Sequence, residues 1–155
     1  MNAFKRLAAA GAVLTGVFAP AAFADEPVDK TGNGIAMADC QIEKLKQSVI
    51  KTFNSGMPRT PEEIRQETVG AITDCAALVT GIDADQIPPV AMPPEIKTPE
   101  SIAAFRAASE RFNAFMDQYV DYQTFETEMD RRYPEVMQLM TEQMQRRGPM
   151  PPGAF

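Results

Sequence analysis

The side chains with the most distinctive chemistry in this sequence are its methionines. The 155-residue chain contains ten of them, and six lie at or beyond Met116. Met137, Met140 and Met144 recur at steps of three and four residues, so their thioethers line one face of a helix. Thioethers are soft ligands that select Cu(I) in preference to harder ions. The same pattern is also typical of a flexible apolar filler in a core, or of a surface that re-packs around different partners.

Two cysteines, Cys40 and Cys75, offer redox chemistry or a covalent bridge. Thirty-four residues separate them in the sequence, whereas reactive pairs usually sit close together as C-x-x-C. In an oxidising compartment, two such cysteines most simply form one structural disulfide. Their midpoint falls in the Gly56-Met57-Pro58-Arg59 turn, so they lie side by side if the flanking helices are antiparallel. We therefore predict a Cys40–Cys75 disulfide that staples an N-terminal helical hairpin.

The residue types that most often carry catalysis are absent or show no pattern. The sequence contains no histidine, which removes the usual general base and the commonest metal ligand. It has no Gly-x-Ser-x-Gly motif and no phosphate-binding loop. The segment from Asp83 begins like an EF-hand, but Pro88 replaces its turn glycine and Pro94 its final glutamate. We therefore predict no catalytic residue and no resident cofactor, and an enzyme is the third hypothesis.

These residues must be positioned by helices, and helix punctuation indicates a single all-α domain over residues 38–147, a small bundle of about four helices. Residues 25–37 are polar and contain two glycines, which predicts a flexible lead-in. The first helix is expected to begin near Ala38. Thr60 opens the second with a T-x-x-E capping box, and Gly81 ends it.

A proline-rich crossover follows the predicted hairpin, over residues 82–97. Its paired prolines hold the chain extended and cannot sustain a helix. Thr98 then opens a long third helix, which either breaks near Thr124 or runs to Arg132. Pro134 is expected to begin the last helix, and residues 148–155 form a Pro- and Gly-rich tail that we expect to be mobile.

The third helix is expected to carry an apolar stripe that needs a cover. Its members are Phe115, Tyr122, Phe125 and Met129, and Tyr133 continues it. If the helix runs straight, this stripe is exposed and marks a surface for a protein or peptide partner, or for self-association. If the last helix folds back, the stripe is buried in a closed bundle.

The first 24 residues have the three parts of a secretion signal. Lys5 and Arg6 precede an apolar run over Leu7–Phe18, and Ala22-Phe23-Ala24 supplies a small-x-small cleavage site. The apolar run is shorter than the roughly 20 residues that a spanning helix needs. We therefore predict cleavage after Ala24 and a periplasmic or secreted mature chain that does not insert into the membrane.

The mature chain that this cleavage would release is acidic. It has 13 Lys and Arg against 21 Asp and Glu, a net charge of −8. Such a charge disfavours nucleic acid as a partner. Together these features favour an exported, non-enzymatic binding or chaperone-like protein with an apolar surface rich in methionine and aromatic residues. The alternative is a periplasmic Cu(I)-binding protein that uses Met137, Met140 and Met144.

Overall fold

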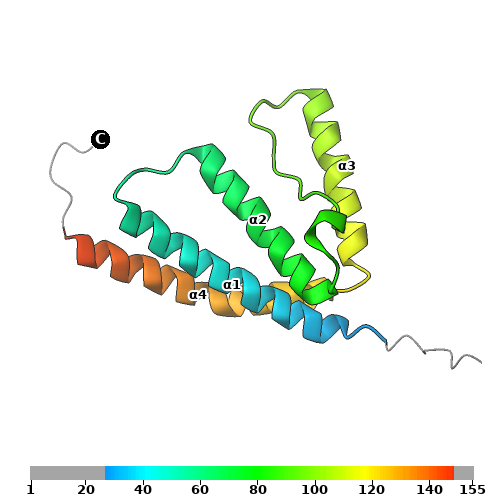
Figure 1. The fold of residues 1–155 in the computed structure, drawn as a ribbon, viewed down its shortest axis with the longest axis horizontal. Helices are drawn as coiled ribbons and strands as arrows, with labels where there is room; N and C mark the ends of the chain where they lie inside the picture. The colour runs from blue at the N-terminus through cyan, green and yellow to red at the C-terminus, as the bar shows by residue number, and fades with distance from the viewer. Residues whose placement is uncertain (1–26, 149–155) are drawn as a thin grey trace, which may run out of the picture.

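The computed structural model describes residues 27–148 of the chain. This part contains four α-helices and one short 3-10 helix, joined by turns and connectors. They are α1 (Lys30–Ser55), α2 (Pro61–Thr80), η1 (Ala84–Gln86), α3 (Pro99–Met116) and α4 (Tyr122–Arg147). Figure 1 shows α1 and α4 side by side as a long pair, with α2 and α3 standing above it. The predicted all-α bundle is confirmed. The predicted signal sequence, and residues 149–155 of the predicted tail, lie outside the described residues.

Helix α1 begins at Lys30, so the prediction of a flexible lead-in over residues 25–37 is wrong for most of that segment. Asp29 caps the helix, because its side chain accepts a hydrogen bond from the Gly32 backbone N–H at 2.9 Å. Gly32 and Gly34 each cost about 1 kcal/mol in a helix relative to alanine. That cost is why the local sequence predicts a loop, and tertiary contacts offset it.

The first turns of α1 dock on the turn between α3 and α4. The Asp121 backbone N–H donates to the Lys30 carbonyl at 2.9 Å, and the Asn33 side-chain amide donates to the Tyr119 carbonyl at 2.9 Å. Gly34 is buried here, and a Cβ added to it would lie 2.8 Å from the Asp121 carbonyl oxygen. The backbone of α1 at Gly34 therefore packs directly against the backbone of the turn between α3 and α4, with no side chain between them.

From that contact, α1 and α4 run parallel to each other. Three links join them along their length, namely Asp39 with Arg132, Lys46 with Glu135, and the Phe53 carbonyl with Arg147. The residue numbers of both partners rise together, as they must for parallel neighbours. Ile42 and Val136 lie on the same helix faces as these links and are buried, so apolar packing lies beneath the ion pairs.

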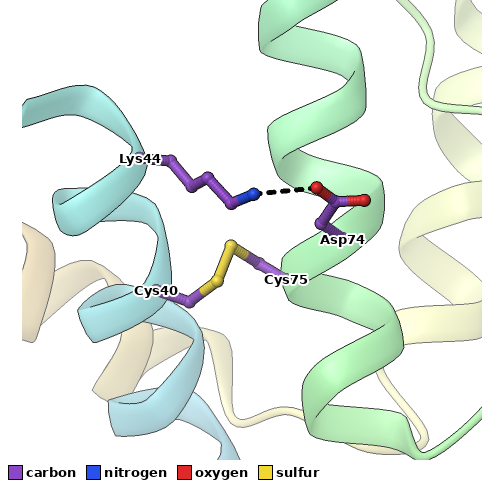
Figure 2. The surroundings of a disulfide bond; sticks show 4 residues. All are labelled: Cys40, Lys44, Asp74 and Cys75. Atoms are coloured by element: carbon purple, nitrogen blue, oxygen red, sulfur yellow. Dashed lines mark hydrogen bonds and ion pairs between the residues drawn. A yellow bond between two sulfur atoms is a disulfide. The ribbon is translucent and has the colours of Figure 1, made fainter. Parts of the chain in front are cut away.

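Helix α2 returns antiparallel to α1 and is bonded to it. The Cys40–Cys75 disulfide joins the two helices, with Cα atoms 5.7 Å apart. Figure 2 shows the bridge beside an ion pair between Lys44 and Asp74, whose nitrogen and oxygen lie 2.8 Å apart. The predicted disulfide and the predicted hairpin are both confirmed.

The main core lies at one end of the molecule, where all four helices meet. Its buried members are Met37, Cys75, Ala76, Ile87, Met116 and Val120. From Ile87 the proline-rich connector leaves this core, and α3 returns to it (Figure 1). Residues 87–98 span about 37 Å when extended at roughly 3.1 Å per residue, and α3 spans about 27 Å. The connector is therefore long enough to let α3 bring the chain back to the start of α1.

Helix α3 ends at Met116, earlier than either of its two expected ends. The chain then turns over residues 117–121, and Met116 just before the turn and Val120 within it are both buried in the core. Asp121 then caps α4, accepting hydrogen bonds from the Gln123 N–H at 3.1 Å and the Thr124 hydroxyl at 2.7 Å.

Helix α4 continues through Pro134, so the prediction that Pro134 begins the last helix is wrong. A proline inside a helix removes the hydrogen bond to the carbonyl four residues before it, which here belongs to Asp130. Both residues are exposed, so water can solvate that carbonyl and the helix persists. The helix ends at Gly148, as predicted. None of the described helices is long and apolar enough to cross a bilayer.

The close approach at Gly34 gives a test of this packing. Gly34→Ala is expected to destabilise the fold by about 1–3 kcal/mol, the usual cost of overpacking, because the new methyl group meets the Asp121 carbonyl. Gly70→Ala is the matched control. Gly70 is also inside a helix, but nothing lies within 4 Å of an added Cβ, so alanine should stabilise the protein by about 0.5–1 kcal/mol. Urea unfolding measures both, and a similar gain for both variants would contradict the contact.

Candidate functional site

The clearest solvent-exposed apolar feature of α4 is a ridge of four side chains. Tyr133, Met137 and Met144 are 48%, 47% and 53% exposed, and Met140 is half-buried. Their spacing of four, three and four residues is that of the knobs of a coiled coil. We call Tyr133, Met137, Met140 and Met144 the outer ridge. Because α4 is continuous through Pro134, the four side chains form one line along the helix.

A second ridge of α4 has the same spacing and faces α1. Phe125 begins it against Gly34, Arg132 follows seven residues later, and Val136 comes one turn after that. Arg132 is ion-paired across to α1 and Val136 is buried. Helix α4 therefore presents two adjacent ridges built for helix packing, and α1 covers one of them.

The aromatic stripe predicted from the sequence is divided between two helices. Phe115 lies on α3, whereas Tyr122 and Phe125 lie on α4, and all three pack against the main core. The rings of Tyr122 and Phe125 meet edge to face with centroids 6.3 Å apart. Burial raises the pKa of the Tyr122 hydroxyl, with a contribution from Asp117. These three rings serve the core, because the turn over residues 117–121 removes the straight helix on which their exposure depended.

Met129, the last member of that stripe, is half-buried on α4. It lies one turn before Tyr133 and beside the outer ridge. The stripe and the methionine set predicted from the sequence thus come together only here, on α4. Tyr133 continues that stripe in the sequence, but its alignment with the three methionines requires α4 to pass through Pro134, which the sequence did not predict.

An ionic cluster fixes the covered side of α4 to α1. Glu135 accepts hydrogen bonds from Arg132 at 3.1 Å and from Lys46 at 2.6 Å, and Arg132 also pairs with Asp39 and lies 3.5 Å from Glu43. Hydrogen bonds from Arg132 and Lys46 lower the pKa of the Glu135 carboxyl to about 2. The two cations and three carboxylates of the cluster are paired with one another across the helix contact, so the cluster holds α4 against α1.

A small hollow opens between α1 and α2. Its volume is about 100 Å³, and its floor includes Leu45, Ala71 and Ile72. Beyond it, at the turn end of the hairpin, Arg59 pairs with Glu67 and ties the two helices together. The disulfide at one end and this ion pair at the other leave the hollow between them, and it is too small for more than one apolar side chain.

A metal site could also be built from Cys, Asp and Glu side chains of residues 27–148. No set of three or more Cys, Asp or Glu side chains lies close enough together there to bind an ion. Comparison with models of known families, with curated proteins and with solved structures finds no match for this chain.

The ionic cluster predicts a pH dependence of stability. The pKa of Glu135 is about 2 in the fold against an ordinary value of 4.5, so its contribution is fully present above about pH 4.5 and is lost as pH falls toward 2. Glu135→Gln should therefore destabilise the protein at neutral pH, and the difference from wild type should vanish near pH 2. Chemical denaturation across this range measures it. The control is Glu142→Gln, an exposed change on α4 at a residue that forms no ion pair within residues 27–148. Equal loss of stability in the two variants would contradict the role of the cluster.

Proposed function

We propose that this protein is an exported, non-enzymatic binding protein of chaperone-like character, which receives apolar segments of other polypeptides on the outer ridge of α4. One observation carries the proposal. Three large side chains, Tyr133, Met137 and Met144, lie in line on α4 and are about half-exposed, while the adjacent ridge of the same helix packs against α1.

The chemistry of these side chains suits variable partners. Methionine is unbranched and polarisable, so it adapts to differently shaped apolar surfaces. Full burial of such a side chain contributes about 1.5–3 kcal/mol, so covering its remaining exposed half contributes about 1 kcal/mol. Three such gains fall short of the 4.1 kcal/mol that corresponds to a millimolar dissociation constant. The ridge alone therefore gives weak and reversible capture, and firm binding needs further contacts.

Export is supported by two independent features. Residues 1–24 have the pattern of a cleavable secretion signal, and the mature chain that would remain contains a disulfide, which persists in oxidising compartments. We place the protein in the periplasm or outside the cell, with its new N-terminus at Asp25.

A second candidate function is Cu(I) binding by Met137, Met140 and Met144. What favours it is that three thioethers share one face of an unbroken helix, two of them about half-exposed. Cu(I) prefers such soft ligands. In this second candidate function, binding depends on the methionine sulfur atoms as metal ligands and not on the apolar surface of the ridge.

Two triple variants distinguish these functions. Replacing Met137, Met140 and Met144 by leucine keeps the apolar volume nearly constant, whereas replacing them by glutamine keeps the length and removes the apolar character. Suppression of the aggregation of a reduced, unfolded protein, followed by light scattering, should survive in the leucine variant and fall strongly in the glutamine variant. A Cu(I) competition titration should lose affinity in both variants if copper is the ligand.

The control for surface polarity is Met57→Gln, which changes an exposed methionine in the α1–α2 turn, away from the outer ridge. It should leave both activities unchanged. Full activity of the glutamine variant in the aggregation assay would contradict the proposed function.

A further inference from the structure

We propose that the partner segment of the outer ridge is an amphipathic α-helix with cationic residues toward one end. This inference rests on the proposed function and specifies the chemistry of its partner. Two observations support it: the coiled-coil spacing of the outer ridge, and a pair of carboxylates that extends the line of the ridge toward the start of α4.

The ridge extends beyond its apolar members. Glu126 and Asp130 precede Tyr133 at steps of four and three residues, so the line from Glu126 to Met144 keeps one coiled-coil spacing throughout. Both carboxylates are exposed. The line therefore begins with an acidic pair and continues with four apolar side chains.

The acidic pair has no cation opposite it in the described part of the chain. Neither Glu126 nor Asp130 forms an ion pair among residues 27–148, whereas the neighbouring cations are engaged elsewhere, Arg131 with Glu128 and Arg132 with Asp39 and Glu135. The negative end of the line is thus left for a partner to neutralise, and a partner with Lys or Arg at that end is complementary to it.

The spacing selects a helix over an extended segment. Successive members of the line rise by about 5.3 Å along the axis, the step of one coiled-coil turn. A helical partner repeats its side chains at the same step, as α1 does on the covered ridge. Side chains on one face of a strand repeat at about 6.7 Å, so an extended partner loses register by more than 4 Å after three steps. A helix of about 18 residues matches the line from end to end.

A second copy of this chain is a poor occupant for the same reason of charge. Parallel pairing of two α4 ridges would set the acidic pair against itself, and like charges repel. Antiparallel pairing would set Glu126 and Asp130 opposite Met144 and Met140. Of the two cations in the last turn of α4, Arg147 is bonded to the Phe53 carbonyl of α1, and Arg146 lies about 200° around the helix from Met144. The carboxylates would therefore lose water without gaining a partner. The occupant is therefore a different polypeptide.

The test uses three synthetic peptides of about 18 residues, measured with the full mature chain by fluorescence anisotropy. All carry the same leucine seam. The first has lysines beside the seam at one end, the second has glutamates at those positions, and the third is the lysine peptide with central prolines that prevent a helix. The lysine peptide should bind about 3- to 30-fold more tightly than the glutamate peptide at low salt, as expected for two exposed ion pairs. High salt should reduce this preference.

The preference must depend on the acidic pair. In the double variant Glu126→Gln with Asp130→Asn, the ratio of the affinities for the lysine and glutamate peptides should fall close to unity. The matched control is Glu110→Gln with Glu142→Gln, which makes the same change in charge at exposed positions away from the ridge. This control should preserve the preference for the lysine peptide. Equal binding of the first two peptides, equal binding of the proline peptide, or a preference that survives in the Glu126/Asp130 variant would each overturn the inference. If the triple Met→Gln variant nonetheless loses all binding, the proposed function stands and only the partner's chemistry is wrong.

Self-association is measured in parallel. Sedimentation of the wild-type chain without peptide should show a monomer, and a dimer that dissociates in the triple Met→Gln variant would assign the ridge to a second copy and overturn the inference.

Discussion

The close contact of Gly34 with the turn before α4 determines the arrangement of the rest of this molecule. Helices α1 and α4 begin at the same point, where the Lys30 carbonyl is bonded to the Asp121 amide. Because they also stay in contact along their length, they run in the same direction. Parallel neighbours need a long return path, and the chain supplies one through α2, the proline-rich connector and α3 (Figure 1). The ion pairs of Arg132 and Lys46 then hold the register that this first contact sets. A side chain at position 34 would separate the two helices where that register begins.

The parallel pair also explains why α4 keeps an open side. Helix α1 covers one ridge of α4, whereas α2 is bonded to the far side of α1 through Cys40–Cys75, and α3 reaches the core only with its C-terminal end. No helix among residues 27–148 covers the outer ridge, so Tyr133, Met137 and Met144 stay about half-exposed. An apolar line of this kind costs solubility, and the charged groups around it offset that cost. Its exposure on a helix that packs against α1 is the observation on which the proposed binding role rests.

The sequence predicted those features that local chemistry decides. The capping box at Thr60, the end of α2 at Gly81 and the disulfide all follow from residues near one another or symmetric about a turn. It did not predict the early start of α1, because two glycines argue locally for a loop and only the distant Asp121 shows why Gly34 belongs in a helix. The sequence also did not predict that α4 continues through Pro134. That continuation depends on the exposure of the Asp130 carbonyl to water, which only the tertiary structure shows. Of the two outcomes expected for the aromatic stripe, Phe115, Tyr122 and Phe125 follow the closed one, because the turn over residues 117–121 brings their rings against the core.

The central claim is that the methionines of the outer ridge are accessible to solvent whereas those of the core are buried. Site-resolved oxidation tests this claim directly. Dilute peroxide converts accessible methionine to the sulfoxide, and peptide mass spectrometry reads each position over time. Met137 and Met144 should oxidise at rates close to those of the unfolded chain, whereas Met37 and Met116, which are 4% and 1% exposed, should be strongly protected. Protection of Met137 and Met144 equal to that of Met116 would show that the ridge is covered, and would contradict this account.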